Sequence, residues 1–223
     1  MTRKDEDIKR DIVNHLYWDA RLDASKISVI VEEGRVRLEG TVPHHLAFRS
    51  AVRDVWDVQG VLSVENRMQV VSTEVTIPPT NTELKDSIEN ILKWNPNTRD
   101  ADITISMVDE GKVTMEGFVD AYWKKLHAEK LVSDVHGVKE IINKLSVVPT
   151  KAFSDEAIAG EVLATLERNA AVDSRAIGIK VERGEVTLTG RVANWGARTA
   201  AFYGALYTKG VVHVNDRLTV KNF

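Results

Sequence analysis

Large aromatic residues stand beside cations at two places where the sequence pattern predicts the start of a helix. Tyr122, Trp123, Lys124 and Lys125 follow one another at the first place, and Trp195 precedes Arg198 by one helical turn at the second. An aromatic ring can enter the headgroup zone of a bilayer while a lysine or arginine meets lipid phosphate. These six residues are therefore predicted to contact a membrane or a partner. The alternative is that the rings fold back onto a neighbouring part of the chain.

Residue patterns for catalysis or metal binding are missing. His44 and His45 are adjacent and cannot easily face one ion, and the other histidines are scattered, so we interpret all six as surface or helix-capping residues. The absence of cysteine excludes disulfides, thiolate zinc sites and thiol catalysis. No nucleophile elbow, Ser-His-Asp arrangement or phosphate-binding loop occurs. We expect no enzymatic activity, no cofactor and no metal.

Charge and hydropathy narrow the class of partner. The net charge is −3, without the strong basic excess of a general nucleic-acid binder. No apolar run approaches the ~20 residues that span a bilayer, and the charged start of the chain does not have the pattern of a signal peptide. We expect a cytoplasmic protein with no nucleic-acid partner.

One nine-residue stretch occurs three times, at residues 34–42, 111–119 and 184–192. Its pattern is Gly-x-Val-x-(Leu/Met)-x-Gly-x-Val. Alternating apolar residues behind a turn glycine predict the second strand of a β-hairpin, half buried on one face. The repeat recurs after 77 and then 73 residues, which indicates three small domains built on one plan.

The order of elements in each repeat is predicted to be helix, strand, strand, helix, strand. The fold class is therefore α+β, with three tandem α-β-β-α-β sandwich domains, each a three-stranded mixed sheet covered by two helices. The domains are predicted at residues 1–73, 80–150 and 151–223. Pro78 and Pro79 predict a stiff, extended first linker. Below, these ranges are called domains 1, 2 and 3.

Several local predictions accompany this plan. Val13 and Tyr17 are expected to widen the buried stripe of the first helix. Trp18 and Trp94, at equivalent positions, are interpreted as packing residues that close the first helix on the sheet. Asn81 or Thr82 is expected to cap the first helix of domain 2.

The strands and the second helix carry predictions of their own. One extra residue in the first hairpin of domain 2 predicts a longer turn or a bulge. Ala51, Ala128 and Ala201 should let the second helix lie close on the sheet. Gly60, Gly137 and Gly210 are predicted to end the second helices at the C′ position.

The repeat resembles the BON domain, a family named after bacterial OsmY and nodulation proteins. The resemblance rests on residues 22–29, on the glycine motif at 34–42, and on Gly60-Val61 with Val64 and Asn66. Domains 2 and 3 resemble the family through residues equivalent to these, except that Asp216 stands where the asparagine is expected. The matching glycines and valines are scaffold positions, so no functional residue is transferred.

The resemblance implies a non-enzymatic attachment module. Family members are mostly envelope proteins linked to osmotic stress, often periplasmic, and binding of anionic phospholipid is the usual proposal. Here it implies binding to a phospholipid surface or an envelope-associated partner in osmotic or other stress, peripheral to the membrane. A second hypothesis is a small-ligand or potassium-ion sensor that compacts on binding. A third is a structural or chaperone-like protein-interaction module.

Overall fold

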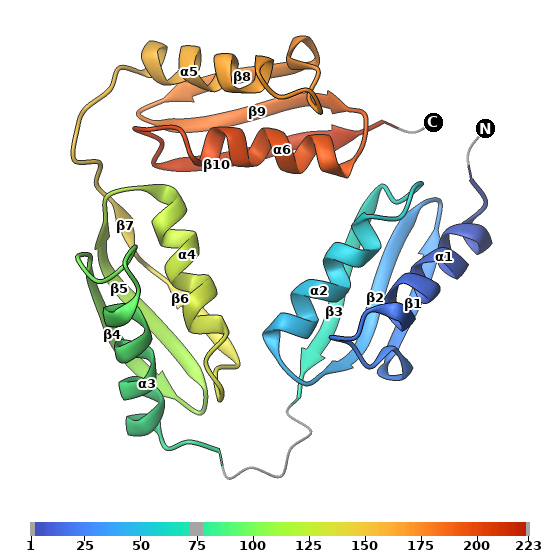
Figure 1. Ribbon diagram of the computed structural model, residues 1–223, viewed down its shortest axis with the longest axis horizontal. Helices are drawn as coiled ribbons and strands as arrows, with labels where there is room; N and C mark the ends of the chain where they lie inside the picture. The colour runs from blue at the N-terminus through green and yellow to red at the C-terminus, as the bar shows by residue number, and fades with distance from the viewer. Residues whose placement is uncertain (1–2, 72–77, 222–223) are drawn as a thin grey trace. The chain divides into compact units, whose positions relative to one another are not determined.

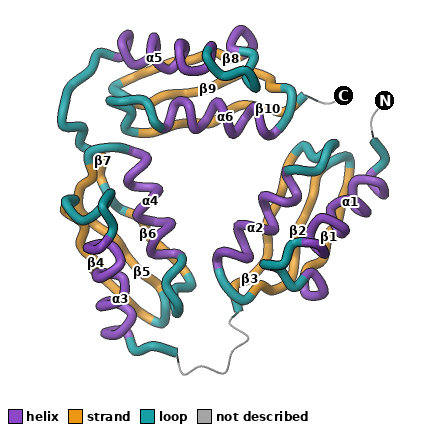
Figure 2. The backbone as a smooth tube through the Cα atoms, in the orientation of Figure 1, coloured by secondary structure: helices purple, strands orange, loops and turns teal. Residues whose placement is uncertain are grey.

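The computed structural model describes residues 3–71 and 78–221, and each predicted domain range contains one sheet with its own helices. Two helices cover one face of each sheet (Figures 1 and 2). The predicted α+β class and threefold repetition are confirmed. Residues 72–77 of the predicted first linker lie outside the described residues.

Domain 1 shows the plan in its complete form. Its elements are helix α1 (Asp5–Trp18), the 3-10 turn η1 (Ala24–Lys26), strands β1 (Ile27–Glu32) and β2 (Arg35–Val42), helix α2 (His45–Trp56) and strand β3 (Ser63–Val70). The middle strand β2 pairs antiparallel with β1 and parallel with β3. The predicted mixed sheet is therefore present.

Domains 2 and 3 repeat this order. Domain 2 has α3 (Asn81–Trp94), β4 (Asp102–Asp109), β5 (Lys112–Val119), α4 (Tyr122–Ser133), β6 (Glu140–Asn143) and β7 (Ser146–Val147). Domain 3 has α5 (Asp155–Glu167), the 3-10 turn η2 (Ser174–Ala176), β8 (Ile177–Glu182), β9 (Glu185–Val192), α6 (Trp195–Leu206) and β10 (His213–Val220). Domain 2 differs in its divided last strand and in a register shift between Ile105 and Met107, which confirms the predicted bulge.

The core of each domain lies between its helices and its sheet. In domain 1 the buried face of α1 is Ile8, Ile12 and Leu16, at the spacing that places them on one side of a helix. Val13 and Tyr17 are exposed, so the prediction that they widen this stripe is wrong. The equivalent alanines of the second helices, Ala51, Ala128 and Ala201, are fully buried, as predicted.

Glycine is required twice in each hairpin. Gly34 turns the chain with φ 72° directly after Glu33, which has φ 50°, and this pair of left-handed residues matches the twist of the strands. Gly40 has φ 118°, and a Cβ there would lie 2.0 Å from the carbonyl oxygen of Lys26. The glycines equivalent to Gly40 in the other hairpins, Gly117 and Gly190, have the same close approach.

The first residue of α1 holds the hairpin turn. The Asp5 carboxylate accepts hydrogen bonds from the backbone N–H groups of Glu33 (2.7 Å) and Gly34 (2.9 Å). Asp155 does the same in domain 3, at 2.8 Å to both Arg183 and Gly184. The acidic start of these helices therefore fastens helix to hairpin, which is a more specific role than the interaction with the helix dipole that the sequence suggests.

Two predictions about helix ends are corrected. Gly60, Gly137 and Gly210 do have positive φ, but the second helices end four residues earlier, so these glycines lie in the turn before the last strand rather than at C′. The cap of α3 is Thr80, not Asn81 or Thr82. Its hydroxyl accepts from the Glu83 N–H while the Glu83 carboxylate accepts from the Thr80 N–H, which is a complete capping box.

Candidate functional site

The structure places the predicted contact residues of domain 2 in the first turn of α4. Tyr122 is buried, and this burial raises its pKa above the ordinary value. Lys124 pairs with Asp120 at 2.8 Å and lies 5.8 Å from the centre of the Trp123 ring. The ring and the cation are thus brought together as the sequence suggests, but the Lys124 charge is balanced within the domain. Lys125 is half-buried.

The equivalent residues of domain 3 start α6. Trp195 is its first residue, and Arg198 follows one turn later. The Arg198 guanidinium donates to Asp216 on β10, with a nitrogen–oxygen distance of 2.7 Å, and both side chains are mostly buried. The charge of this predicted membrane-contact residue is therefore also balanced inside its own domain.

His44 serves as a cap, as predicted. It precedes the first residue of α2, and its Nδ1 accepts a hydrogen bond from the Ala47 N–H at 3.1 Å. Among the described residues, no group of three or more histidines and carboxylates is placed to hold a metal ion.

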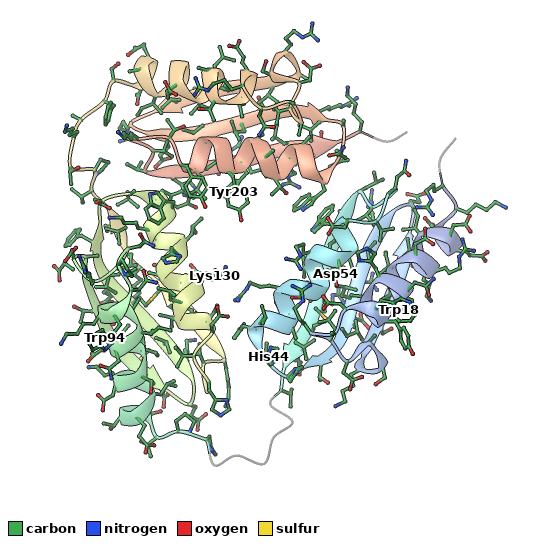
Figure 3. The ribbon with its side chains drawn as sticks, in the orientation of Figure 1. Trp18, His44, Asp54, Trp94, Lys130 and Tyr203 are labelled. Carbon is green, nitrogen blue, oxygen red and sulfur yellow. The ribbon has the colours of Figure 1, made fainter. Side chains whose placement is uncertain are left out.

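The most exposed large rings are at the ends of the first helices. Trp18 ends α1 and Trp94 ends α3, and each is 81% exposed (Figure 3). Tyr17, 70% exposed, lies edge-on to Trp18 with ring centres 5.5 Å apart. The interpretation of Trp18 and Trp94 as packing residues is therefore wrong. Each indole lies two residues after the last buried leucine of its helix and is exposed rather than packed on the sheet.

Beside Trp18 lies a shallow depression of about 570 Å³, formed by the end of α1, the loop after it and the end of α2. Two carboxylates meet there. Asp19 accepts from the backbone N–H of Arg21 (2.9 Å) and from two nitrogens of the Arg21 guanidinium, with Nε at 2.8 and 3.0 Å from its two oxygens. Asp54, on α2, has a side chain only 6% exposed.

The two carboxylates are in unequal environments. Hydrogen bonds from Arg21 hold the pKa of Asp19 well below its usual range. Burial, together with the hydrogen bond that the protonated form can donate to Asp19 and the negative charge of Asp19, raises the pKa of Asp54 to about 6. The nearest guanidinium nitrogens, of Arg21 and Arg53, are 3.7 and 3.9 Å from Asp54, beyond hydrogen-bonding distance. Asp54 is therefore the member of the pair that takes up a proton as the pH falls through about 6.

A sequence model of the BON domain matches residues 4–72, 80–149 and 154–222, which is nearly the whole chain. The chain belongs to the BON domain family. BON domains are binding modules associated with phospholipid membranes rather than catalytic units, and this chain carries three of them.

Comparison of the three BON domains shows which features are shared. Asp19 corresponds to Asn95 and Asn169, whose side-chain oxygens accept from the N–H two residues later at 2.9 and 3.0 Å, as Asp19 does. The position of Asp54, six residues before the turn glycine, is Leu131 in BON domain 2 and Gly204 in BON domain 3. The turn is common to all three domains, but the carboxylate pair occurs in BON domain 1. Sequence reasoning missed it, although an aspartate on the apolar side of α2 was the available signal.

The aspartate at 216 keeps the local hydrogen bond of the BON asparagine. Asn66 and Asn143 accept from the N–H two residues later, at 2.9 and 3.1 Å, and Asp216 accepts from Leu218 in the same way at 3.0 Å. Its second oxygen takes the bond from Arg198. The departure from the family pattern is thus explained by the ion pair with Arg198.

Comparisons with individual proteins add little. Curated proteins give no significant match. CdsD, a structural protein of the type III secretion system of Chlamydia trachomatis, is 13% identical over 96% of this chain and 92% of that chain, with a TM-score of 0.26. The periplasmic domain of the inner-membrane protein PrgH from S. typhimurium is 16% identical over 88% and 94%, with a TM-score of 0.23. Among the described residues, no helix has the length and hydropathy to cross a membrane.

Proposed function

We propose that this protein is a non-enzymatic attachment protein whose BON domains bind a phospholipid membrane surface. The observation that carries the proposal is the pair of nearly fully exposed tryptophans, Trp18 and Trp94, at equivalent helix ends of two domains. Indole rings gain most at the boundary between headgroups and acyl chains, where the apolar body is buried and the N–H still finds a partner. Their position beyond the packed face of each helix leaves them available for such a contact.

Charge and repetition support the same function. Lys93, an exposed cation in the last turn of α3, adjoins Trp94 and can approach lipid phosphate. Two weak sites on one chain act together when both reach the same surface, which multiplies the apparent affinity. The sequence-predicted residues at the starts of α4 and α6 are kept as a second contact, made chiefly by Trp123 and Trp195.

We further propose that the protein acts in osmotic or other stress and that it is cytoplasmic and peripheral to the membrane. An envelope-associated protein is the alternative partner. An envelope protein would be recognised by the same exposed rings, because tryptophan and tyrosine are enriched at the centres of protein interfaces.

Cosedimentation with lipid vesicles tests the proposal. The wild type should pellet with phosphatidylglycerol–phosphatidylcholine vesicles, less with phosphatidylcholine alone, and less again as salt is raised. The double variant Trp18→Ala, Trp94→Ala should lose most of this binding while its circular dichroism is unchanged. The matched double variant Trp123→Ala, Trp195→Ala tests the second contact and should lose less. A wild type that stays in the supernatant under all conditions contradicts the membrane function.

A further inference from the structure

BON domain 1 combines two features that no other described part of the chain combines: an exposed tryptophan and, beside it, a buried carboxylate with an oxygen that has no hydrogen-bond partner. Trp18 and Asp54 line the same shallow depression. Trp94, at the equivalent helix end of BON domain 2, has Leu131 in the place of Asp54, and BON domain 3 has Arg168 and Gly204. The depression of BON domain 1 therefore differs in its side chains from the equivalent helix ends of the other two domains.

The geometry makes Asp54 hard to ionise. Asp19 is held as a carboxylate by Arg21, so a second negative charge on Asp54 would lie buried against the first. One oxygen of Asp54, Oδ2, is buried and has no hydrogen-bond donor among the described residues. A proton between the two carboxyl groups removes both difficulties, because it supplies the missing bond and cancels one charge.

The other groups around Asp54 set the net charge of the depression. The depression is lined by His15 and Asn14 from α1, by Arg21 from the loop after it, by Arg53 from α2, and by Asp57, which directly follows α2. Together with Asp19, they leave the surface next to Trp18 nearly balanced. With His15 counted as neutral, these groups and Asp54 carry a net charge of zero when Asp54 holds a proton and −1 when it does not.

We propose that the Asp19–Asp54 pair makes BON domain 1 a proton-dependent membrane anchor, which binds an anionic lipid surface more strongly when the pair holds a proton. The inference rests on the proposed function, with the lipid surface as partner. Loss of one negative charge beside Trp18 reduces repulsion from lipid phosphate. A single charge near such a surface changes binding by about fivefold.

The first test needs no membrane. Carbon-13 NMR of the full chain, labelled at aspartate carboxyl groups, should show one carboxyl titrating near pH 6. Asp54→Asn should remove this titration, whereas Asp57→Asn, an exposed carboxylate of the same depression, should leave it in place. If no aspartate of the wild type titrates near pH 6, the inference is refuted whatever the protein binds.

The second test measures the coupling. Phosphatidylglycerol–phosphatidylcholine vesicles keep their charge between pH 5.0 and 7.5. The partition coefficient at pH 5.0 divided by that at pH 7.5 therefore reports on protonation of the protein. Asp54→Asn should bind about fivefold more strongly than wild type at pH 7.5, and its ratio should be about fivefold smaller. Asp57→Asn should strengthen binding at both pH values and keep the wild-type ratio, which accounts for any contribution from histidines elsewhere.

The two tests separate the possible failures. If the wild type shows the NMR titration near pH 6 but Asp54→Asn has the same ratio of partition coefficients as the wild type, the coupling to the membrane is refuted. Absence of vesicle binding at both pH values refutes the proposed function and the anchor together. Asp54→Leu, which introduces the residue of BON domain 2, serves as a second variant if Asp54→Asn does not fold.

Discussion

The hairpin glycines are the same in all three BON domains, whereas the corner where the two helices of a domain end differs from one domain to the next. In the hairpin, the same glycines recur with the same positive φ and the same close approach to a backbone carbonyl. At the corner, the pair of positions 19 and 54 holds two carboxylates in domain 1, Asn95 with Leu131 in domain 2, and Asn169 with Gly204 in domain 3. The hairpin is thus the common scaffold, and each domain acquires its own chemistry at the corner.

The strongest test of this comparison is a substitution in the hairpin. Gly40→Ala places a Cβ 2.0 Å from a backbone oxygen at φ 118°, and it should destabilise domain 1 by about 3 kcal/mol or more. Hydrogen exchange followed by mass spectrometry, which resolves the domains, measures the loss. The control is Gly160→Ala in α5, where a Cβ meets nothing within 4 Å. It should stabilise domain 3 by about 0.5 to 1 kcal/mol. Equal effects of the two substitutions would contradict the conclusion that the hairpin requires glycine at position 40.

The next test concerns the corner of domain 1. Because folding raises the pKa of Asp54 to about 6, the protonated form stabilises the domain below the unfolded pKa, and this stability is lost as pH rises through 6. Asp54→Asn should therefore stabilise domain 1 by about 2 to 3 kcal/mol at pH 7.5 and by only about 1 kcal/mol at pH 4.5. Urea unfolding at both pH values checks this. A stability difference that does not depend on pH would show that Asp54 acts only by its size.

A smaller effect is expected where helix meets hairpin. Asp5→Ala removes two hydrogen bonds to the turn and should cost domain 1 about 1 to 2 kcal/mol. Domain 2 has Asn81 at this position, and within residues 78–221 no side chain accepts a hydrogen bond from the N–H groups of Glu110 and Gly111. Asn81→Asp should therefore slow hydrogen exchange of that turn. Unchanged exchange would mean that the aspartate alone cannot make the contact.

The smallest effect on stability is expected at the exposed rings. Trp18→Ala should change the unfolding free energy of domain 1 by less than about 0.5 kcal/mol, because its side chain is almost wholly in solvent. Trp56→Ala, by contrast, removes a ring that packs against the core of the same domain and should cost more than about 1 kcal/mol. Thermal unfolding of the two variants measures both losses of stability. A large loss from Trp18→Ala would show that this ring stabilises the fold.

Much of the scaffold was predictable because it depends on local patterns. The strands, the hairpin turns and the bulge in domain 2 follow from alternation, glycine spacing and one extra residue. The corner was not predictable in the same way. Whether Trp18 turns onto the sheet depends on whether a space is left for it, and the charge of Asp54 depends on Asp19 and Arg21, which reach it only after α1 and α2 pack. Ion pairs such as Arg198–Asp216, which balance the predicted contact residues, likewise join segments distant in sequence.

The pairing of β3 has a consequence for synthesis on the ribosome. This strand, the last of domain 1, lies beside the middle strand β2 along all eight of its residues, from Arg35 opposite Ser63 to Val42 opposite Val70. The hairpin can form as soon as both its strands have left the exit tunnel, but the sheet remains two-stranded, and too small to be stable alone, until the final strand follows. Each repeat completes its own sheet before the next repeat is synthesised. At any time during synthesis, therefore, about one domain of the nascent chain is incomplete and can misfold.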